Sequence, residues 1–291
     1  MKTAVILAAR REKDSEIPYP LMPFAEGLCL LDRTLGILRD LHFSNIVLVV
    51  GYKAEMFQKY AAEDVKLIKN EDYEFTASMG SLALAKDDIQ EDFLLIESDT
   101  FYGRRVLEEL AARTEGNCLS MTEESGSGDE CFMETKNGFA TKITKDRHRV
   151  CHFEGEMIGV SRISLDTYKH LIEAWEHASN PYLNYEYLLM DVTDPLDRPV
   201  IMFKNLIWGD VDCEEDFKKL QNDIYPRLRR REDPFDYDNL MMHLQSIFSG
   251  EDVSKVEIIQ IGGMSNKNFR VNFEGKSYVL RVPGNGSEGM V

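Results

Sequence analysis

Residues 5–24 read VILAARREKDSEIPYPLMPF and join an apolar run to a charged loop and a proline-rich turn. The run AVILAA (4–9) has no polar interruption, which is typical of a strand buried on both faces of a sheet. In nucleotide-binding α/β proteins such a strand usually leads into glycines, because backbone N–H groups must approach the phosphates closely. The residues that follow here are charged instead: Arg10, Arg11, Glu12, Lys13 and Asp14.

The chain continues with alternating strand and helix patterns. Apolar runs predict strands at 45–51, 65–70 and 92–99, and helical spacing predicts helices at 30–41, 53–62, 81–89 and 104–113. Such alternation is typical of right-handed βαβ units around an open, mostly parallel sheet. Because ligands bind at the carboxyl ends of the strands in such sheets, we expect residues 8–20 and 97–102 to lie side by side at the site.

The pattern changes after residue 116. Short runs at 117–123, 138–145, 149–155 and 156–164 predict strands with antiparallel pairing, and helices are expected at 164–178, 214–230 and 235–249. Three short strands joined by Gly/Asn turns follow. We predict a first domain at 1–228, a helical linker at 229–252 and a short β segment at 253–291.

Composition restricts the classes of function. The chain has 291 residues, 43% hydrophobic and 29% charged, and a net charge of −17, which argues against nucleic acid or an anionic membrane as the partner. No signal peptide or membrane-spanning run is apparent. The five cysteines show no metal-binding or disulfide spacing and indicate thiols of a cytoplasmic protein. They are Cys29, Cys118, Cys131, Cys151 and Cys213.

Two acidic clusters follow predicted strands. Glu97 and Asp99 end the run LLIESD, and Asp210 and Asp212 lie in WGDVDCEEDF. Carboxylate oxygens are the ligands that Mg²⁺ prefers, usually one or two together with substrate phosphates. The same positions are also typical of helix caps, by Asp99 in one cluster and by Asp212 or Cys213 in the other.

The order of these motifs resembles the sugar-nucleotide-type nucleotidyltransferases, most of all the CTP:phosphocholine cytidylyltransferases. The resemblance rests on AVILAA, NIVLVVGY, SMGSL, the ESD strand end and GDVDCEEDFKKL, and it covers about residues 1–225. It implies an α/β, Rossmann-like nucleotidyltransferase fold with a mostly parallel central sheet. It also implies a reaction in which a phosphomonoester attacks the α-phosphorus of a magnesium-bound triphosphate.

The resemblance assigns roles to residues at the strand ends. It implies that Asp99 and Asp212, with Asp210 beside them, bind Mg²⁺. Nucleotide binding falls to a set of small residues after the first strand and in EDYEFTASMGSL: Ala8, Ala9, Thr76, Ser78 and Ser81. Ser78 and Ser81 are equally suited to capping the following helix.

The first loop departs from the family pattern. RREKDSE stands where the family has glycines and an arginine, and alignment on the prolines puts Tyr19 at the position of the family's lysine. A tyrosine is uncharged at neutral pH and cannot replace an ammonium group. We predict that Arg10, Arg11 and Lys13 supply the catalytic positive charge. The alternative is a solvated loop of a protein that has lost or redirected the activity.

The acceptor side is predicted from aromatic residues. Quaternary ammonium groups bind aromatic faces, often beside a carboxylate. The proposed phosphocholine site is Tyr182, Tyr185, Glu186 and Trp208. Aromatic residues at this spacing are also typical of a core. The Gly/Ser-rich acidic segment 122–132 fits either a lid or a surface connection.

The C-terminal segment resembles the start of the choline/ethanolamine kinases. GGMSNKNF is similar to their glycine-rich turn over ATP, and YVLRVPG to the following strand, with Arg281 in place of a lysine. This resemblance implies that 253–291 holds only the first strands of a kinase domain. Whether these strands pack on the first domain, pair in a homodimer or lack order is left open.

These observations predict transfer of CMP from CTP to phosphocholine with Mg²⁺, giving CDP-choline and pyrophosphate. Another nucleotide or a sugar phosphate as acceptor is an alternative within the same enzyme class. A non-catalytic module that binds nucleotides or choline metabolites is the alternative from a different class.

Overall fold

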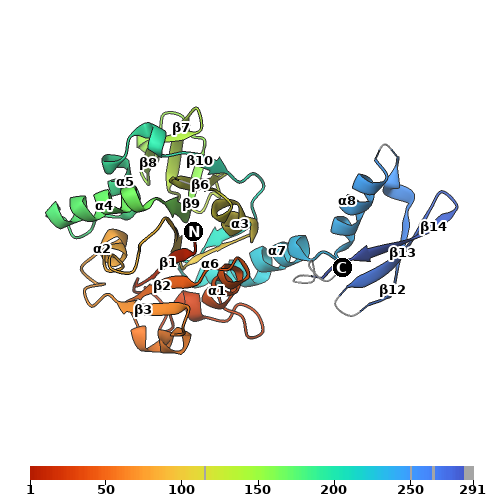
Figure 1. Cartoon of the computed structure of the whole chain (residues 1–291), viewed down its shortest axis with the longest axis horizontal. Coiled ribbons are helices and arrows are strands. Elements are labelled where there is room, and N and C mark those ends of the chain that lie inside the picture. The colour runs from red at the N-terminus through yellow and green to blue at the C-terminus, as the bar shows by residue number, and fades with distance from the viewer. Residues whose placement is uncertain (115, 250, 264–265, 285–291) are drawn as a thin grey trace. The chain divides into compact units, whose positions relative to one another are not determined.

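The computed structural model describes residues 1–114, 116–249, 251–263 and 266–284. The chain forms two compact units, Met1–Ile224 and Tyr225–Val291 (Figure 1). Across the described residues, every helix is too short or too polar to cross a lipid bilayer.

The first unit is built on a nine-stranded sheet in which seven strands follow the order β10-β6-β9-β4-β1-β2-β3. β1 pairs in parallel with β2 and β4, and β2 pairs in parallel with β3, whereas β9 is antiparallel to β4 and β6. A hairpin, β7–β8, joins the sheet through β9. The strands are β1 (Thr3–Ala8), β2 (Asn45–Val50), β3 (Val65–Lys69), β4 (Phe93–Glu97), β6 (Cys118–Thr122), β7 (Phe132–Lys136), β8 (Phe139–Thr144), β9 (Gly155–Ile163) and β10 (Val200–Met202).

Helices cover both faces of this sheet (Figure 1). Residues of α1 and α3 pack into one apolar core, and residues of α2, α4 and α5 pack into another. The helices of this unit are α1 (Leu30–Asp40), α2 (Ser78–Ala83), α3 (Arg105–Ala111), α4 (Leu165–His177), α5 (Tyr185–Val192) and α6 (Glu214–Lys219).

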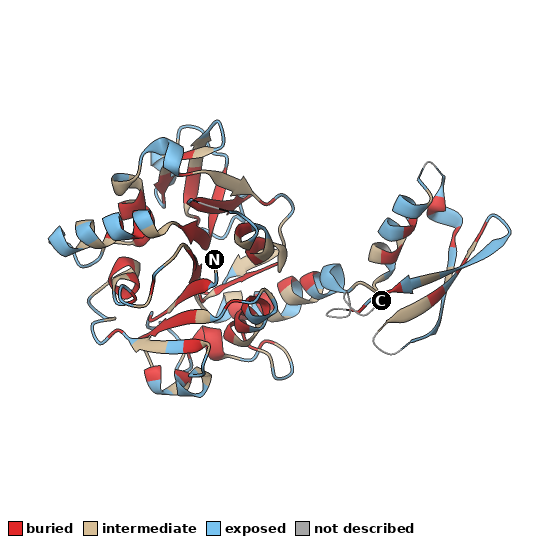
Figure 2. Ribbon diagram, viewed as in Figure 1, coloured by how far each residue is buried: buried red, intermediate tan, exposed pale blue. Residues whose placement is uncertain are grey.

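The central strands are buried on both faces, as the apolar runs predict (Figure 2). Along β1, Ala4 and Ile6 face the core under α1, while Val5 faces the core under α2. Because side chains alternate along a strand, one short apolar run supplies both cores. This explains why AVILAA has no polar interruption.

The strand ends come together as the parallel topology predicts. Leu7 of β1 lies in register with Glu97 of β4, so the loops after both strands leave the same edge of the sheet. A separate two-stranded sheet pairs β5 (Thr100–Tyr102) antiparallel to β11 (Trp208–Asp210), with Thr100 opposite Asp210. This pairing brings the second acidic cluster to the first.

Some local predictions are wrong. Of the strand predicted at 149–155, only Gly155 lies in a strand, β9, because a 3-10 turn at Arg147–Arg149 and a loop precede it. The predicted helix 53–62 is a 3-10 helix at Ala54–Tyr60. The predicted helix 214–230 is confirmed, since α6, a π-helical turn at Leu220–Ile224 and α7 (Tyr225–Glu232) follow one another directly.

The second unit has its own small core. It contains α7, α8 (Tyr237–Ile247) and an antiparallel sheet of β12 (Glu257–Gly262), β13 (Lys267–Phe273) and β14 (Lys276–Val282). Leu244 packs with Val271 and Phe273, so the helix and the sheet bury apolar residues together. Of the kinase-like segment, Met264, Ser265 and residues 285–291 lie outside the described residues.

Candidate active site

A cavity of about 420 Å³ lies at the carboxyl ends of β1 and β4. Among its lining residues are two groups that we name by the elements that carry them. The strand-end group consists of Arg10, Glu97, Asp99, Asp210 and Asp212. The hairpin group consists of Asp129, Cys131 and Lys145.

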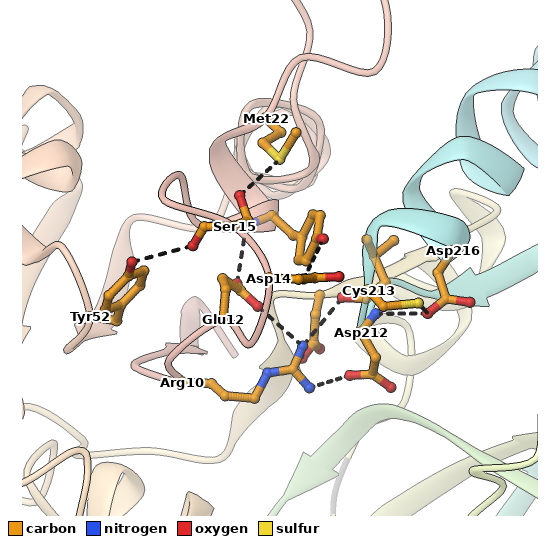
Figure 3. A network of polar contacts seen from close by, with 12 residues as sticks. Arg10, Glu12, Asp14, Ser15, Met22, Tyr52, Asp212, Cys213 and Asp216 are labelled. Carbon is orange, nitrogen blue, oxygen red and sulfur yellow. Dashed lines mark hydrogen bonds and ion pairs between the residues drawn. The ribbon is translucent and has the colours of Figure 1, made fainter.

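Arg10 connects the carboxylates around it, and Figure 3 shows its guanidinium next to Glu12 and Asp212. Its Nη2 lies 3.3 Å from Oδ2 of Asp99, and its Nη1 donates to Oδ1 of Asp212. Nη2 also donates to the carbonyl oxygen of Val211 at 3.2 Å, and Oε2 of Glu12 lies 3.7 Å away. One guanidinium therefore connects the loop after β1 with the segments that follow β4 and β11.

These contacts also settle the helix-cap alternatives. The side chain of Asp99 is paired with Arg10, and the backbone N–H of Val211 donates to the Asp99 carbonyl oxygen at 3.0 Å. Cys213 is the residue that precedes α6, while the side chain of Asp212 contacts Arg10. Both predicted metal ligands thus direct their carboxylates toward the same cation.

The electrostatics of the strand-end group are dominated by negative charge. Burial, together with the charges of Asp99 and Glu186, raises the pKa of Glu97 to about 8. Burial likewise raises the pKa of Asp99, and Arg10 acts in the opposite direction. Partial burial lowers the pKa of Arg10, but Asp99 and Asp212 outweigh it and raise that pKa. The strand-end group therefore contains four carboxyl groups and one guanidinium, that of Arg10, which cannot neutralise all of them.

The loop after β1 folds without the glycines that the family pattern has. All of residues 10–18 are described, and none has a positive φ. The buried carboxylate of Glu12 accepts the backbone N–H of Tyr19 at 3.0 Å, which fixes the turn. The substitution of arginine for glycine is therefore compatible with the backbone of this loop.

Tyr19 points into the protein rather than into the cavity. Its side chain is buried, its hydroxyl donates to Oδ1 of Asp14 at 2.8 Å, and its ring lies 5.8 Å from that of Phe217. Of the three predicted cationic residues, Arg10 and Arg11 line the cavity. Lys13 instead lines a separate surface depression beside Tyr52.

The predicted nucleotide-binding residues lie mostly at the cavity. Ala9, Thr76, Ser78 and Ser81 line it, whereas Ala8 is buried in the core under α1. Asn70 organises this edge, since its Nδ2 donates at 3.0 Å to both Thr76 Oγ1 and Ser81 Oγ.

Ser78 connects two helices rather than capping its own. Ala77, not a serine, precedes α2. Ser78 Oγ accepts the backbone N–H of Tyr185, the first residue of α5, at 3.0 Å. The hydroxyl therefore fixes the start of α5 next to the cavity, which also fixes the position of Glu186.

Lys145 is a cavity residue that the sequence analysis did not identify. It directly follows β8, and its Nζ donates to Oδ2 of Asp129 at 2.9 Å. Partial burial lowers its pKa, but Asp129 outweighs that effect and raises it. Lys145 could not be recognised as a site residue from sequence alone. It reaches the end of β4 only because β8 pairs with β7, β7 with β9, and β9 with β4.

The predicted choline site is brought together only in part. Glu186 lines the cavity and is buried. Burial raises its pKa, and the charge of Lys145 acts in the opposite direction. Within the described residues, the cavity lining does not include Tyr182, which is 61% exposed, Tyr185, which is in the core, or Trp208.

The donor chemistry of the strand-end group fits a divalent cation. Among the described residues, no group of three or more His, Cys, Asp or Glu is arranged to hold a metal. Asp99 and Asp212 nevertheless contact one cationic group, the guanidinium of Arg10, and Mg²⁺ usually takes one or two carboxylates plus phosphate oxygens. These two residues, with Asp210 beside them, are those that would hold Mg²⁺, and the metal would neutralise triphosphate charge.

The second unit shows where its kinase-like motifs lie. Gly262, the last residue of β12, and Gly263, which follows it, have φ of 142° and 111°. Arg281 on β14 lies opposite Asn268. The kinase resemblance of this unit stays a prediction.

Comparison with solved structures identifies the fold of the first unit as that of nucleotidyltransferases. The inositol-1-phosphate CTP transferase from T. maritima aligns with a TM-score of 0.60 and 18% identity over 77% of this chain and 98% of that one. The CTP:phosphocholine cytidylyltransferase from Streptococcus pneumoniae aligns with a TM-score of 0.62 and 18% identity over 76% and 98%. The predicted fold class is confirmed.

Sequence comparison finds relatives of the same kind. The chain is 34% identical over 127 residues to the CMP-5'-(3-aminopropyl)phosphonate synthase of Streptomyces rubellomurinus, covering 40% of this chain and 20% of that protein. It is 35% identical over 108 residues to the choline-phosphate cytidylyltransferase of Haemophilus influenzae, covering 35% and 46%. A bifunctional IPC transferase and DIPP synthase of Archaeoglobus fulgidus is 24% identical over 75% of this chain and 43% of that protein.

These matches confirm the predicted resemblance to nucleotidyltransferases, including cytidylyltransferases. No family model matches the chain. The chain spans less than half the length of the three curated relatives.

Proposed function

We propose that this protein transfers CMP from CTP to a phosphate- or phosphonate-bearing acceptor that also carries an ammonium group, with Mg²⁺ as cofactor. The observation that carries the proposal is the cavity in which the paired carboxylates of Asp99 and Asp212 share one space with Arg10, Arg11 and Lys145. Phosphoryl-type transfer depends mainly on positioning and on charge neutralisation, and these residues supply both.

The nucleotide is placed against the loop after β1 and the start of α2 in this proposal. Small polar side chains at Thr76, Ser78 and Ser81 leave room for a base and ribose and offer hydrogen-bonding groups. Arg10 and Arg11 are suited to phosphate oxygens because a guanidinium donates in a fixed fork. Lys145 lines the cavity and Tyr19 does not, so the lysine is the residue available to bind the acceptor phosphate.

The acceptor is placed near Lys145 and Glu186. A phosphate or phosphonate would bind the ammonium group of Lys145, and the positive end of the acceptor would lie by the buried carboxylate of Glu186. Relatives that act on choline phosphate and on an aminopropylphosphonate support an acceptor with these two charges. Phosphocholine is the first candidate, and aminoalkyl phosphates and phosphonates are the next.

The test is incubation of the full chain with CTP, MgCl₂ and one acceptor at a time while pyrophosphate is followed. Phosphocholine, phosphoethanolamine, aminoethylphosphonate and a sugar phosphate form the acceptor panel, and ATP, GTP and UTP replace CTP in parallel. Pyrophosphate release that requires an ammonium-bearing acceptor supports the proposal. Release only with the sugar phosphate, or none with any acceptor, overturns it.

A binding module without turnover is the second candidate, favoured by the replacement of the family's lysine by a tyrosine. Calorimetry with CTP and phosphocholine would then show binding, while no pyrophosphate forms. Tyr19→Lys is not expected to create activity, because the side chain at this position is buried and would place an ammonium group in the protein interior.

A further inference from the structure

The pairing of Arg10 with two carboxylates is not accounted for by its proposed role at the phosphates. In the strand-end group Arg10 contacts the two carboxylates that are the proposed ligands of Mg²⁺, Asp99 and Asp212. Figure 3 shows the contact with Asp212. A guanidinium and a divalent cation cannot lie between the same two carboxylates at the same time. Arg10, in the loop after β1, is therefore placed to compete with the metal.

The contacts show that this position is well defined. Arg10 holds Asp99 by one terminal nitrogen and Asp212 by the other, and it also donates to the Val211 carbonyl oxygen. The contact with Asp99 is an ion pair, whereas the hydrogen bond to Asp212 joins two charged groups and is therefore roughly twice as strong as a neutral one. The side chains of Asp99 and Asp212 are only 21% and 32% exposed, so water screens these pairs incompletely.

We propose that Arg10 is the resting cation of the Asp99–Asp212 pair and that a divalent metal binds these carboxylates only after Arg10 has left them. The triphosphate is the ligand that makes this exchange favourable, because its oxygens offer the guanidinium a new bidentate partner. The metal then enters together with the nucleotide, and the free protein holds it weakly. This inference rests on the proposed role of Asp99 and Asp212, but not on turnover.

Arg11 provides a matched control. It follows Arg10 directly and lines the same cavity, but its Nη1 pairs with Oε1 of Glu74 at 2.7 Å. Removing Arg11 takes the same charge from the same cavity and leaves the Arg10 contacts to Asp99 and Asp212 in place. Comparison of the Arg10 and Arg11 variants therefore separates the loss of a competing cation from a general loss of positive charge in the cavity.

The experiment is a titration of Mn²⁺ into the nucleotide-free full chain, with free Mn²⁺ measured by electron paramagnetic resonance. We expect Arg10→Ala to bind Mn²⁺ roughly five- to ten-fold more tightly than the unchanged protein, as the loss of a competing ion pair of about 1 kcal/mol implies. Arg11→Ala is expected to change the affinity less than about two-fold. The double variant Arg10→Ala, Asp99→Asn is expected to lose the gain.

Circular dichroism and thermal unfolding confirm that each variant is folded, and Arg10→Gln is a second variant that keeps more of the side chain. No gain of affinity in either folded Arg10 variant overturns the inference, and so does an equal gain in Arg11→Ala. The Mn²⁺ titration is independent of pyrophosphate release. Failure of the proposed function and failure of this inference are therefore distinguishable.

Discussion

Two of the three described cationic residues that line the cavity, Arg10 and Lys145, are held in different ways. Arg10 pairs with Asp99 and Asp212, whose side chains are 21% and 32% exposed and whose backbones follow strands. Lys145 pairs with Asp129, whose side chain is 61% exposed and lies in a loop. Exposed pairs contribute little free energy, so Lys145 is the cation that a ligand recruits at low cost. Arg10 is the one that a ligand must displace.

The comparison predicts its largest effect for Asp99→Asn. The substitution keeps the size of the side chain but removes a carboxylate from the strand-end group. We expect kcat/KM for pyrophosphate release to fall about 10²- to 10³-fold, as for loss of one preorganised electrostatic group. Asp129→Asn, in the hairpin group, is the control and should lower it less than about ten-fold. Equal losses in both variants would contradict the distinction between the two groups.

Lys145→Met tests the hairpin group directly. Loss of its ammonium group should lower kcat/KM for the acceptor about ten- to 100-fold while KM for CTP changes little, because the lysine is placed at the acceptor phosphate. Lys142→Met is the matched control, since Lys142 is on the same hairpin but pairs with Glu134 and is not among the lining residues described. Steady-state kinetics with each substrate varied in turn would measure both. A change confined to CTP would move Lys145 to the nucleotide.

Gly159→Ala tests how tightly the strand-end group is packed. Gly159 of β9 has φ of 74°, and a Cβ there would lie 2.9 Å from Oε2 of Glu97. We expect a loss of about 1–3 kcal/mol in the free energy of unfolding, measured in urea. Two causes contribute to this loss, the positive φ and the contact of the new Cβ with Glu97, and Gly138→Ala separates them. Gly138 also has a positive φ, 83°, but a Cβ there meets nothing within 4 Å. If both variants lose the same free energy, contact with Glu97 contributes nothing.

The smallest effect is expected from pH, which changes the free energy of unfolding through Glu156 of β9. This residue contacts Ser125 in the loop that leads to the hairpin group. Glu156 is buried and accepts the backbone N–H of Ser125, and burial raises its pKa to about 7 from an ordinary value of 4.5. Between these pH values the folded protein binds a proton that the unfolded chain has lost. The Glu156 contribution is therefore fully present below about pH 4.5 and is lost as pH rises to 7.

Urea unfolding at several pH values measures this dependence. The free energy of unfolding is expected to fall as the pH rises from 5 to 7, and Glu156→Gln should reduce this fall by on the order of 1–2 kcal/mol. Glu154→Gln, two residues earlier and exposed, should leave the fall unchanged. A flat profile in the unchanged protein would exclude this contribution.

The fold was predictable where sequence patterns are local. Apolar runs identified β1, β2 and β4, and the parallel topology put Glu97 beside Leu7. The strand predicted at 149–155 failed because RVCHFEG has strand-like residues but forms a turn and a loop before β9. The helix at 214–230 was predicted correctly, but its π-helical turn has no local signal, since Leu220–Ile224 has the pattern of an ordinary helix.

The site was predictable for residues that follow strands and not for those placed by tertiary pairing. Asp99 and Asp212 are recognisable as acidic residues at strand ends, but their shared contact with Arg10 depends on the pairing of β5 with β11. Lys145 has no motif of its own. The orientation of the Tyr19 side chain could not be predicted either. An alignment gives the position of a residue in the chain, but it does not show whether the side chain lines the cavity.

The pairing of β5 with β11 also has a consequence for synthesis. Arg10 and Asp212 are 202 residues apart in the chain, so the emerging polypeptide contains the loop after β1 long before its partner exists. Until the segment around Asp212 leaves the ribosome, the guanidinium of Arg10 has only Glu12, Asp99 and water as partners. A growing chain can therefore form its central strands early, yet it gains a complete cavity only near the end of the first unit's translation.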